Sequence, residues 1–302
     1  MLFLLTAVFV VSAGAPARDT KSSRVDTSLC SALLSALQVH DNEYAEVRLP
    51  QVINFDYKRS DFEKFYALNL ALWSSDNYLT HLKSFVEKLR DGRSLTSDED
   101  LDLKMIRARL KQIRFAYAAF SSGHSYPPLT HKMTVKIGHL QDALKNGRQD
   151  LVKENADKII ALLTKSKKIQ RELEDFQASS GSSFLTSIRE EMDFMDRGIK
   201  KLESGQITAK DFHNMRKVIS RLVSVFDTIN TIQPSTHTDM VVKYLSTLNG
   251  IMGREHNRLI FEAFNNKLDY EGENVHINVP ALVPLLRNLT ATIRRSLDVA
   301  RS

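Results

Sequence analysis

Apolar residues recur along most of this chain at alternating steps of three and four positions. The clearest series begins at Leu103, and others run through 159–176, 185–202 and 212–229. The members of the clearest series are Leu103, Ile106, Leu110, Ile113, Tyr117 and Phe120. Such spacing places the apolar side chains along one stripe of a helix, the arrangement used where helices pack together. The pattern therefore predicts long amphipathic helices.

Capping residues and glycines mark where these helices begin and end. Ser60 and Glu63 have the spacing of a capping box, and Gly147 and Gly205 follow helical runs, as is typical of helix C-termini. The predicted helices lie near 26–40, 60–91, 97–122, 130–146, 150–179, 183–204, 208–232, 237–268 and 280–300. Short connections favour antiparallel neighbours. We expect an all-α fold, a bundle of eight or nine mostly long helices.

The composition agrees with one large helical domain. The chain is 42% hydrophobic and 26% charged, which is ordinary for a chain with a packed core. Glycine and proline are sparse, at 11 and 7 residues. We expect a single domain over 15–302, in which the stretch 121–130 is the best candidate for an internal boundary because it contains Pro127 and Pro128.

The N-terminus predicts secretion. Leu2 to Val11 is an apolar run broken by Thr6, and small residues follow it. This is the pattern of a secretory signal peptide, here 1–14, with cleavage after Gly14 or after Ala13. A membrane span needs ~20 apolar residues, about twice the length of this run. No second run of that length follows, so we expect no stable membrane insertion.

Cysteine usage is unusual for a secreted chain. Cys30 is the only cysteine, so no intrachain disulfide can form. It lies among Leu29, Leu33, Leu34 and Leu37, which have helical spacing. We expect a buried free thiol, with an intermolecular bridge as the alternative.

The motifs of catalysis and metal binding are missing. The nine histidines lack ligand spacing, with His131 eight residues before His139, and no H-E-x-x-H occurs. The serine run 179–183 lacks the G-x-S-x-G pattern and lies between helices. We therefore predict no enzyme, no metal site and no cofactor.

Basic residues are the more informative signal. The net charge of +6 indicates affinity for anionic surfaces. Cations share helix faces in the central helices and recur in the last helix. The candidate residues for an anionic partner are Arg107, Lys111, Arg114, Lys165, Lys168, Arg171, Arg294 and Arg295. The alternative is a set of solvated faces balanced by acids such as Glu172 and Glu174.

Two smaller signals concern modification and apolar ligands. Asn288-Leu289-Thr290 is the only glycosylation sequon, and it falls inside a predicted helix. Methionines such as Met192, Met195 and Met215 lie on the apolar stripes. They could line a cavity for a lipid, although methionine at helical spacing is commonly core filler.

The leader Leu2–Val11, the lone Cys30, the basic charge, the mass and the near-continuous amphipathic helices together resemble the thirty-four-kilodalton salivary family of mosquitoes. The resemblance covers the overall character of the whole chain, and no functional residue can be carried over from it. It implies release into a vertebrate host during feeding and modulation of haemostasis or immune signalling.

The sequence thus predicts a secreted, non-enzymatic binding protein. We expect its partner to be an extracellular or host protein, with a glycosaminoglycan as a further candidate, and not nucleic acid. The alternative function is a helical carrier of an apolar small molecule or lipid. The pattern leaves the oligomeric state open.

Overall fold

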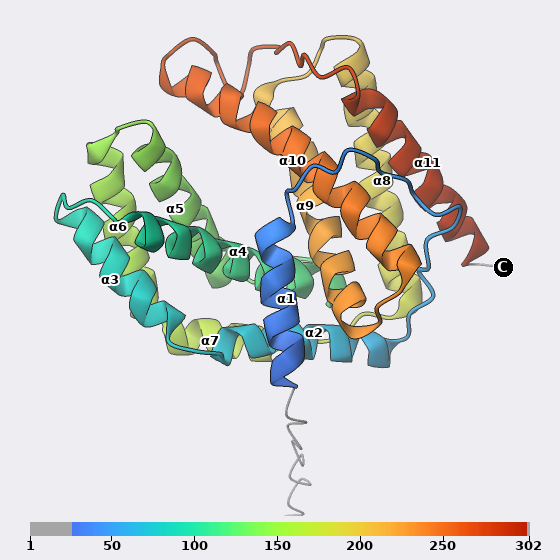
Figure 1. Ribbon diagram of the computed structural model, residues 1–302, viewed down its shortest axis with the longest axis horizontal. Coiled ribbons are helices and arrows are strands. Elements are labelled where there is room, and N and C mark those ends of the chain that lie inside the picture. The colour runs from blue at the N-terminus through green and yellow to red at the C-terminus, as the bar shows by residue number, and fades with distance from the viewer. Residues whose placement is uncertain (1–25, 301–302) are drawn as a thin grey trace, which may run out of the picture.

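A computed structural model describes residues 26–300, in which eleven helices and no strands occur (Figure 1). The helices are α1 (Thr27–Val39), α2 (Arg59–Ser74), α3 (Tyr78–Arg90), α4 (Ser97–Phe120), α5 (Pro128–Lys145), α6 (Gln149–Leu163), α7 (Ser166–Glu174), α8 (Gly181–Glu203), α9 (Ala209–Ile232), α10 (Thr236–Phe264) and α11 (Leu282–Val299). The all-α prediction is confirmed. The predicted signal peptide lies outside the described residues.

Two of the predicted helices are each divided in two, which accounts for the larger number. The segment predicted as 60–91 breaks between α2 and α3, where Asp76 has a φ of 50°. Serine, aspartate and asparagine favour caps and turns over helix interiors because their side chains bond to nearby backbone. The segment predicted as 150–179 breaks at Thr164 and Lys165, and α7 then ends at Glu174.

The chain after α7 is held against the end of α4 instead of continuing as a helix. The Ser179 amide donates to the Phe120 carbonyl at 2.8 Å, and the Ser122 amide donates to the Gln177 carbonyl at 2.8 Å. These bonds use backbone groups that a helix through Ser179 would need internally. The earlier end of α7 is therefore a consequence of a tertiary contact.

The buried side chains form two hydrophobic clusters. One gathers α3, α5, α6 and α7 around α4 between Leu103 and Ile113, and the other gathers α8, α9, α10 and α11 around the end of α4. Both include residues of α2 and of α4, such as Leu110 in one cluster and Phe120 in the other, each fully buried. Figure 1 shows α4 running across the molecule between the two groups of helices.

A segment without helix, from residue 41 to 58, connects α1 to α2 along the outside of α10 and reaches α11 (Figure 1). The Tyr44 amide donates to the Thr247 hydroxyl at 3.1 Å, and the Ile53 amide donates to the Ser296 hydroxyl at 2.8 Å. These bonds attach the segment, here called the strap, to both helices. Among the described helices, none is both long enough and apolar enough to span a membrane.

Arg109 stabilises the break between α2 and α3. Its guanidinium donates to both carboxylate oxygens of Asp76, at 2.7 and 2.9 Å, and lies 4.4 Å from the ring centroid of Tyr78. This interaction holds the pKa of Asp76 below its usual value. The Arg109 side chain is 6% exposed. A substitution that removes its charge but keeps an apolar chain of similar length therefore retains the packing and loses the charge-assisted hydrogen bonds to Asp76.

We expect Arg109→Met to lower the free energy of unfolding by about 1.5–3 kcal/mol, the range for hydrogen bonds to charged groups. Urea denaturation measures this. Lys104→Met is the matched control on the same helix, because Lys104 forms only an exposed pair with Asp100. Equal effects of the two substitutions would contradict a specific role for Arg109.

Candidate anion-binding site

The three basic residues of α4 that the sequence predicts to bind an anionic partner lie between helices and not on an open outer face. Arg107, Lys111 and Arg114 share one side of α4 because they are four and three residues apart. Arg114 is 7% exposed, and Arg107 and Lys111 are half-buried. The side chains are therefore enclosed by protein on several sides.

The neighbouring helix α9 adds two further cations. α4 packs against α9, and Arg216 and Lys217 are both half-buried there. Burial lowers the pKa of Lys111 well below its usual value, and the charges of Arg107, Arg216 and Arg114 lower it further. Burial and then Arg107 lower the pKa of Arg216 to about 10. We call Arg107, Lys111, Arg114, Arg216 and Lys217 the cationic cluster.

No member of the cationic cluster forms an ion pair with a carboxylate in the described part of the chain. Other arginines do, for example Arg221 with Glu191 at 2.6 Å and Arg294 with Asp196 at 2.6 Å. Asp41 and Asp142 lie close enough to raise the pKa of Arg216 without forming such a pair. The cluster therefore keeps an excess of positive charge.

A buried acid next to Lys111 does not supply the missing charge. Asp227 and Lys111 line the same narrow recess, which has a volume of about 10 Å³. Burial raises the pKa of Asp227 to about 8, so at pH 7 the carboxyl is mostly protonated. Its Oδ2 atom has no hydrogen-bond partner.

Neutral groups orient the guanidinium groups of α4. The Arg107 Nη1 atom donates to the Gln141 side-chain oxygen at 2.9 Å, and the Arg114 Nη1 atom donates to the Thr134 hydroxyl at 2.7 Å. A Cβ atom at Gly138 would lie 2.7 Å from the Arg107 Nη2 atom, so glycine provides room for this guanidinium. The Nε atoms of Arg107 and Arg114 have no acceptor.

Two histidines complete the surroundings of Arg216. Its Nη1 atom lies 3.4 Å from His256 Nδ1, and His256 Nε2 lies 3.2 Å from the Tyr270 hydroxyl. The His213 and His256 rings stack with centroids 4.5 Å apart. Burial, with the nearby positive charges, lowers the pKa of His213 to about 3 and that of His256 to about 2.

This arrangement favours an anion. Both histidines are neutral at pH 7, and His256 Nδ1 is placed to accept from Arg216. Arg216 Nε also lacks an acceptor. A phosphate, sulfate or carboxylate group would supply both negative charge and acceptors for these donors. The chemistry that the cluster supports is therefore binding through charge-assisted hydrogen bonds.

The other predicted cations lie elsewhere. Lys165, Lys168 and Arg171 are exposed on or next to α7. On α11, Arg294 pairs with Asp193 and Asp196 of α8, and Arg295 donates to the Gln51 carbonyl at 3.3 Å. The structure thus does not bring the three basic groups together, and the charge of Arg294 is already balanced.

Cys30 and Asn288 are both placed on helices. Cys30 lies in α1, is 8% exposed and is a free thiol, whose pKa burial raises. Asn288 is exposed in α11, and its amide donates to the Tyr244 hydroxyl at 3.2 Å. No group of three or more histidine, cysteine, aspartate or glutamate residues suited to a metal ion occurs within 26–300.

Sequence reasoning missed the contribution of α9 and α10. Arg216 and Lys217 lie between Met215 and Ile219 of the apolar series 212–229, and His256 lies within a later helix. The adjacent basic pair is a local signal of charge. Nothing local shows that this side of α9 meets the basic side of α4. Comparison of the chain with protein-family models, with curated proteins and with solved structures finds no match.

Proposed function

We propose that this protein is a secreted, non-enzymatic binding protein whose cationic cluster takes a compact anionic group of its partner. One observation carries the proposal. All five side chains of the cluster are buried or half-buried without an ion pair to a carboxylate, whereas Arg109, Arg221 and Arg294 elsewhere have such pairs.

The unpaired charges of the cluster lower the stability of the unliganded protein. Removing a charged group from water is costly unless an opposite charge compensates it. Like charges on Arg107, Lys111 and Arg216 add repulsion. A bound anion reduces both the cost of burying the charges and their mutual repulsion. This reduction contributes to the free energy of binding.

The proposed partner follows from the leader sequence and from the partial burial of the cluster. Secretion implies an extracellular or host protein, and the resemblance to salivary proteins implies a role in host haemostasis or immune signalling. Half-buried cations favour a protruding phosphate, sulfate or clustered carboxylate over a flat polymer backbone. A sulfated glycosaminoglycan is the second candidate partner, and nucleic acid is not proposed.

Calorimetric titration of the secreted chain with inorganic pyrophosphate tests the site. We expect Lys111→Met and Arg216→Met each to weaken binding tenfold or more, since a charge-assisted hydrogen bond contributes about 1.5–3 kcal/mol. Gly138→Ala should also weaken binding, because its methyl group would displace the Arg107 guanidinium without removing a charge.

The matched controls are Lys168→Met and Arg171→Met, which remove exposed cations of α7. Unchanged affinity in these variants would support a site at the cluster. If they weaken pyrophosphate binding as much as Lys111→Met does, the anion interacts with the overall charge and the proposal fails. Binding that disappears between 50 and 150 mM salt for all variants alike would lead to the same conclusion.

The second candidate function, a carrier of an apolar small molecule, is favoured by a separate feature. A cavity of about 330 Å³ lies between the strap and the turn that joins α9 to α10. It shares no lining residue with the cationic cluster.

A further inference from the structure

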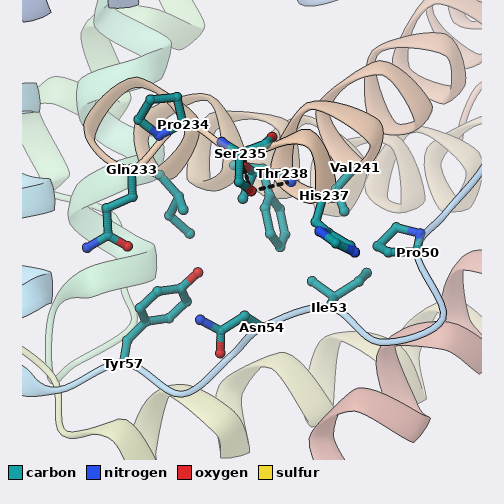
Figure 2. A pocket seen from close by; sticks show the side chains of 12 residues that line it. Pro50, Ile53, Asn54, Tyr57, Gln233, Pro234, Ser235, His237, Thr238 and Val241 are labelled. Atoms are coloured by element: carbon teal, nitrogen blue, oxygen red, sulfur yellow. Dashed lines mark hydrogen bonds between the residues drawn. The ribbon is translucent and has the colours of Figure 1, made fainter.

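The cavity beside the strap has an apolar floor (Figure 2). Ile53 is 3% exposed, and Phe226 and Val241 are each 1% exposed. Ile229 also lines the cavity, and the rings of Pro50 and Pro234 lie at its edges. A ligand here would therefore bury mostly apolar surface, as is typical of small-molecule sites.

One polar group from the core is directed into this space. The hydroxyl of Tyr57 points toward the turn between α9 and α10 in Figure 2. Tyr57 is 5% exposed, and its ring packs edge-on against Phe62, Phe65 and Phe184, with centroids 6.3, 5.4 and 6.4 Å away. Its hydroxyl has no hydrogen bond to any residue within 26–300, so a fixed ring presents an unused donor and acceptor.

No carboxylate, ammonium or guanidinium group lines the cavity, and His237 is the imidazole at its rim. Burial, with a smaller contribution from Asp61, raises the pKa of Tyr57 to about 12, so the hydroxyl stays protonated at pH 7. Ser235 and Thr238 bond to each other in the capping box of α10 and are occupied there. An ionic ligand would have no aspartate, glutamate, lysine or arginine to pair with in the cavity. A neutral ligand gives up few hydrogen bonds to water when it enters.

The size of the cavity limits the ligand further. Its volume of about 330 Å³ is at the lower end of the range for ligand pockets, roughly 300–1,000 Å³. A compact ring or short branched chain fits that volume, and a long-chain lipid does not. The exposed side chains of Asn54, Gln233 and His237 form the polar rim.

We propose that this cavity is a binding site for a small, neutral, mainly apolar molecule whose hydroxyl or carbonyl group hydrogen-bonds to Tyr57. The proposal rests on the second candidate function, the carrier of an apolar small molecule, and the site shares no lining residue with the cationic cluster. Its recognition elements are the apolar floor for the body of the ligand and the Tyr57 hydroxyl for its polar end.

Benzyl alcohol and toluene are suitable probes because each is a benzene ring with a one-carbon substituent, and only benzyl alcohol carries a hydroxyl group on that carbon. Chemical-shift titration of the protein should show benzyl alcohol binding more tightly than toluene. Tyr57→Phe should weaken benzyl alcohol binding roughly three- to tenfold, the loss expected for one hydrogen bond, and leave toluene binding unchanged.

Asn54→Trp should block both probes, since Asn54 is exposed at the rim and a larger side chain there fills the cavity without disturbing the core. Gln51→Trp is the matched control, because Gln51 is exposed on the same strap and does not line the cavity. Failure of both probes to bind the native chain, or equal binding to Asn54→Trp, would overturn the proposal. Arg216→Met should leave both affinities unchanged, which separates this site from the anion site.

Discussion

Arg216→Met is expected to stabilise the unliganded protein while it abolishes most of its anion affinity. The pKa of Arg216 is lowered to about 10 from an ordinary 12.5, mainly by burial. A pKa difference of one unit corresponds to about 1.4 kcal/mol. Allowing for partial exposure, we expect the free energy of unfolding at pH 7 to rise by about 1–3 kcal/mol. Methionine keeps the apolar part of the arginine stem, so packing against α10 changes little.

Thermal unfolding with and without pyrophosphate measures both effects. Saturating ligand should raise the melting temperature of the native chain, because it binds only the folded state, and should leave that of Arg216→Met nearly unchanged. Arg109→Met is the informative comparison, since the same substitution on a paired arginine is expected to destabilise. If Arg216→Met without ligand melts at a lower temperature than the native chain, the prediction is wrong. The charge of Arg216 would then be stabilised in the native chain by interactions other than ion pairs.

Acidification below pH 6.5 is expected to destabilise the protein through His213 and His256. Their folded-state pKa values are about 3 and about 2, below the ordinary 6.5. Above pH 6.5 both states are neutral and the histidines contribute nothing to the pH dependence. Between pH 6.5 and 4.5 only the unfolded state binds the protons, so each histidine lowers the free energy of unfolding by about 1.4 kcal/mol per pH unit.

Asp227 has the opposite effect on the free energy of unfolding between pH 6.5 and 4.5. Its folded-state pKa of about 8 exceeds the ordinary 3.8, so the folded state holds a proton that the unfolded state has lost. Stability from this group therefore rises as the pH falls from 8 toward 4. The histidine effect is consequently measured as a difference between variants and not from the native chain alone.

His256→Gln should reduce the loss of stability between pH 6.5 and 4.5 by about 1.4 kcal/mol per pH unit relative to the native chain. Urea denaturation at several pH values gives these slopes. His237→Gln, at an exposed position near the start of α10, is the control. Identical slopes in the native chain and in His256→Gln would mean that His256 is protonated in the folded state, contrary to its environment beside Arg216.

Helix positions could largely be predicted from the sequence because hydrophobic periodicity is a local property. The series from Leu103 to Phe120 coincides with α4, and the series within 212–229 lies within α9. The break at Asp76 could not be predicted in this way. The partner that holds Asp76 is Arg109, thirty-three positions further along the chain.

The candidate site also has one part that could be predicted from the sequence and one part that depends on tertiary packing. Helix geometry alone placed Arg107, Lys111 and Arg114 on one side of a helix, so the sequence determined that these charges lie close together. Only the packing of α4 against α9 decided that Arg216 joins them and that their charges are partly removed from water. The physical reason is range: periodicity acts within a few turns, whereas burial and charge repulsion depend on contacts between residues about a hundred positions apart.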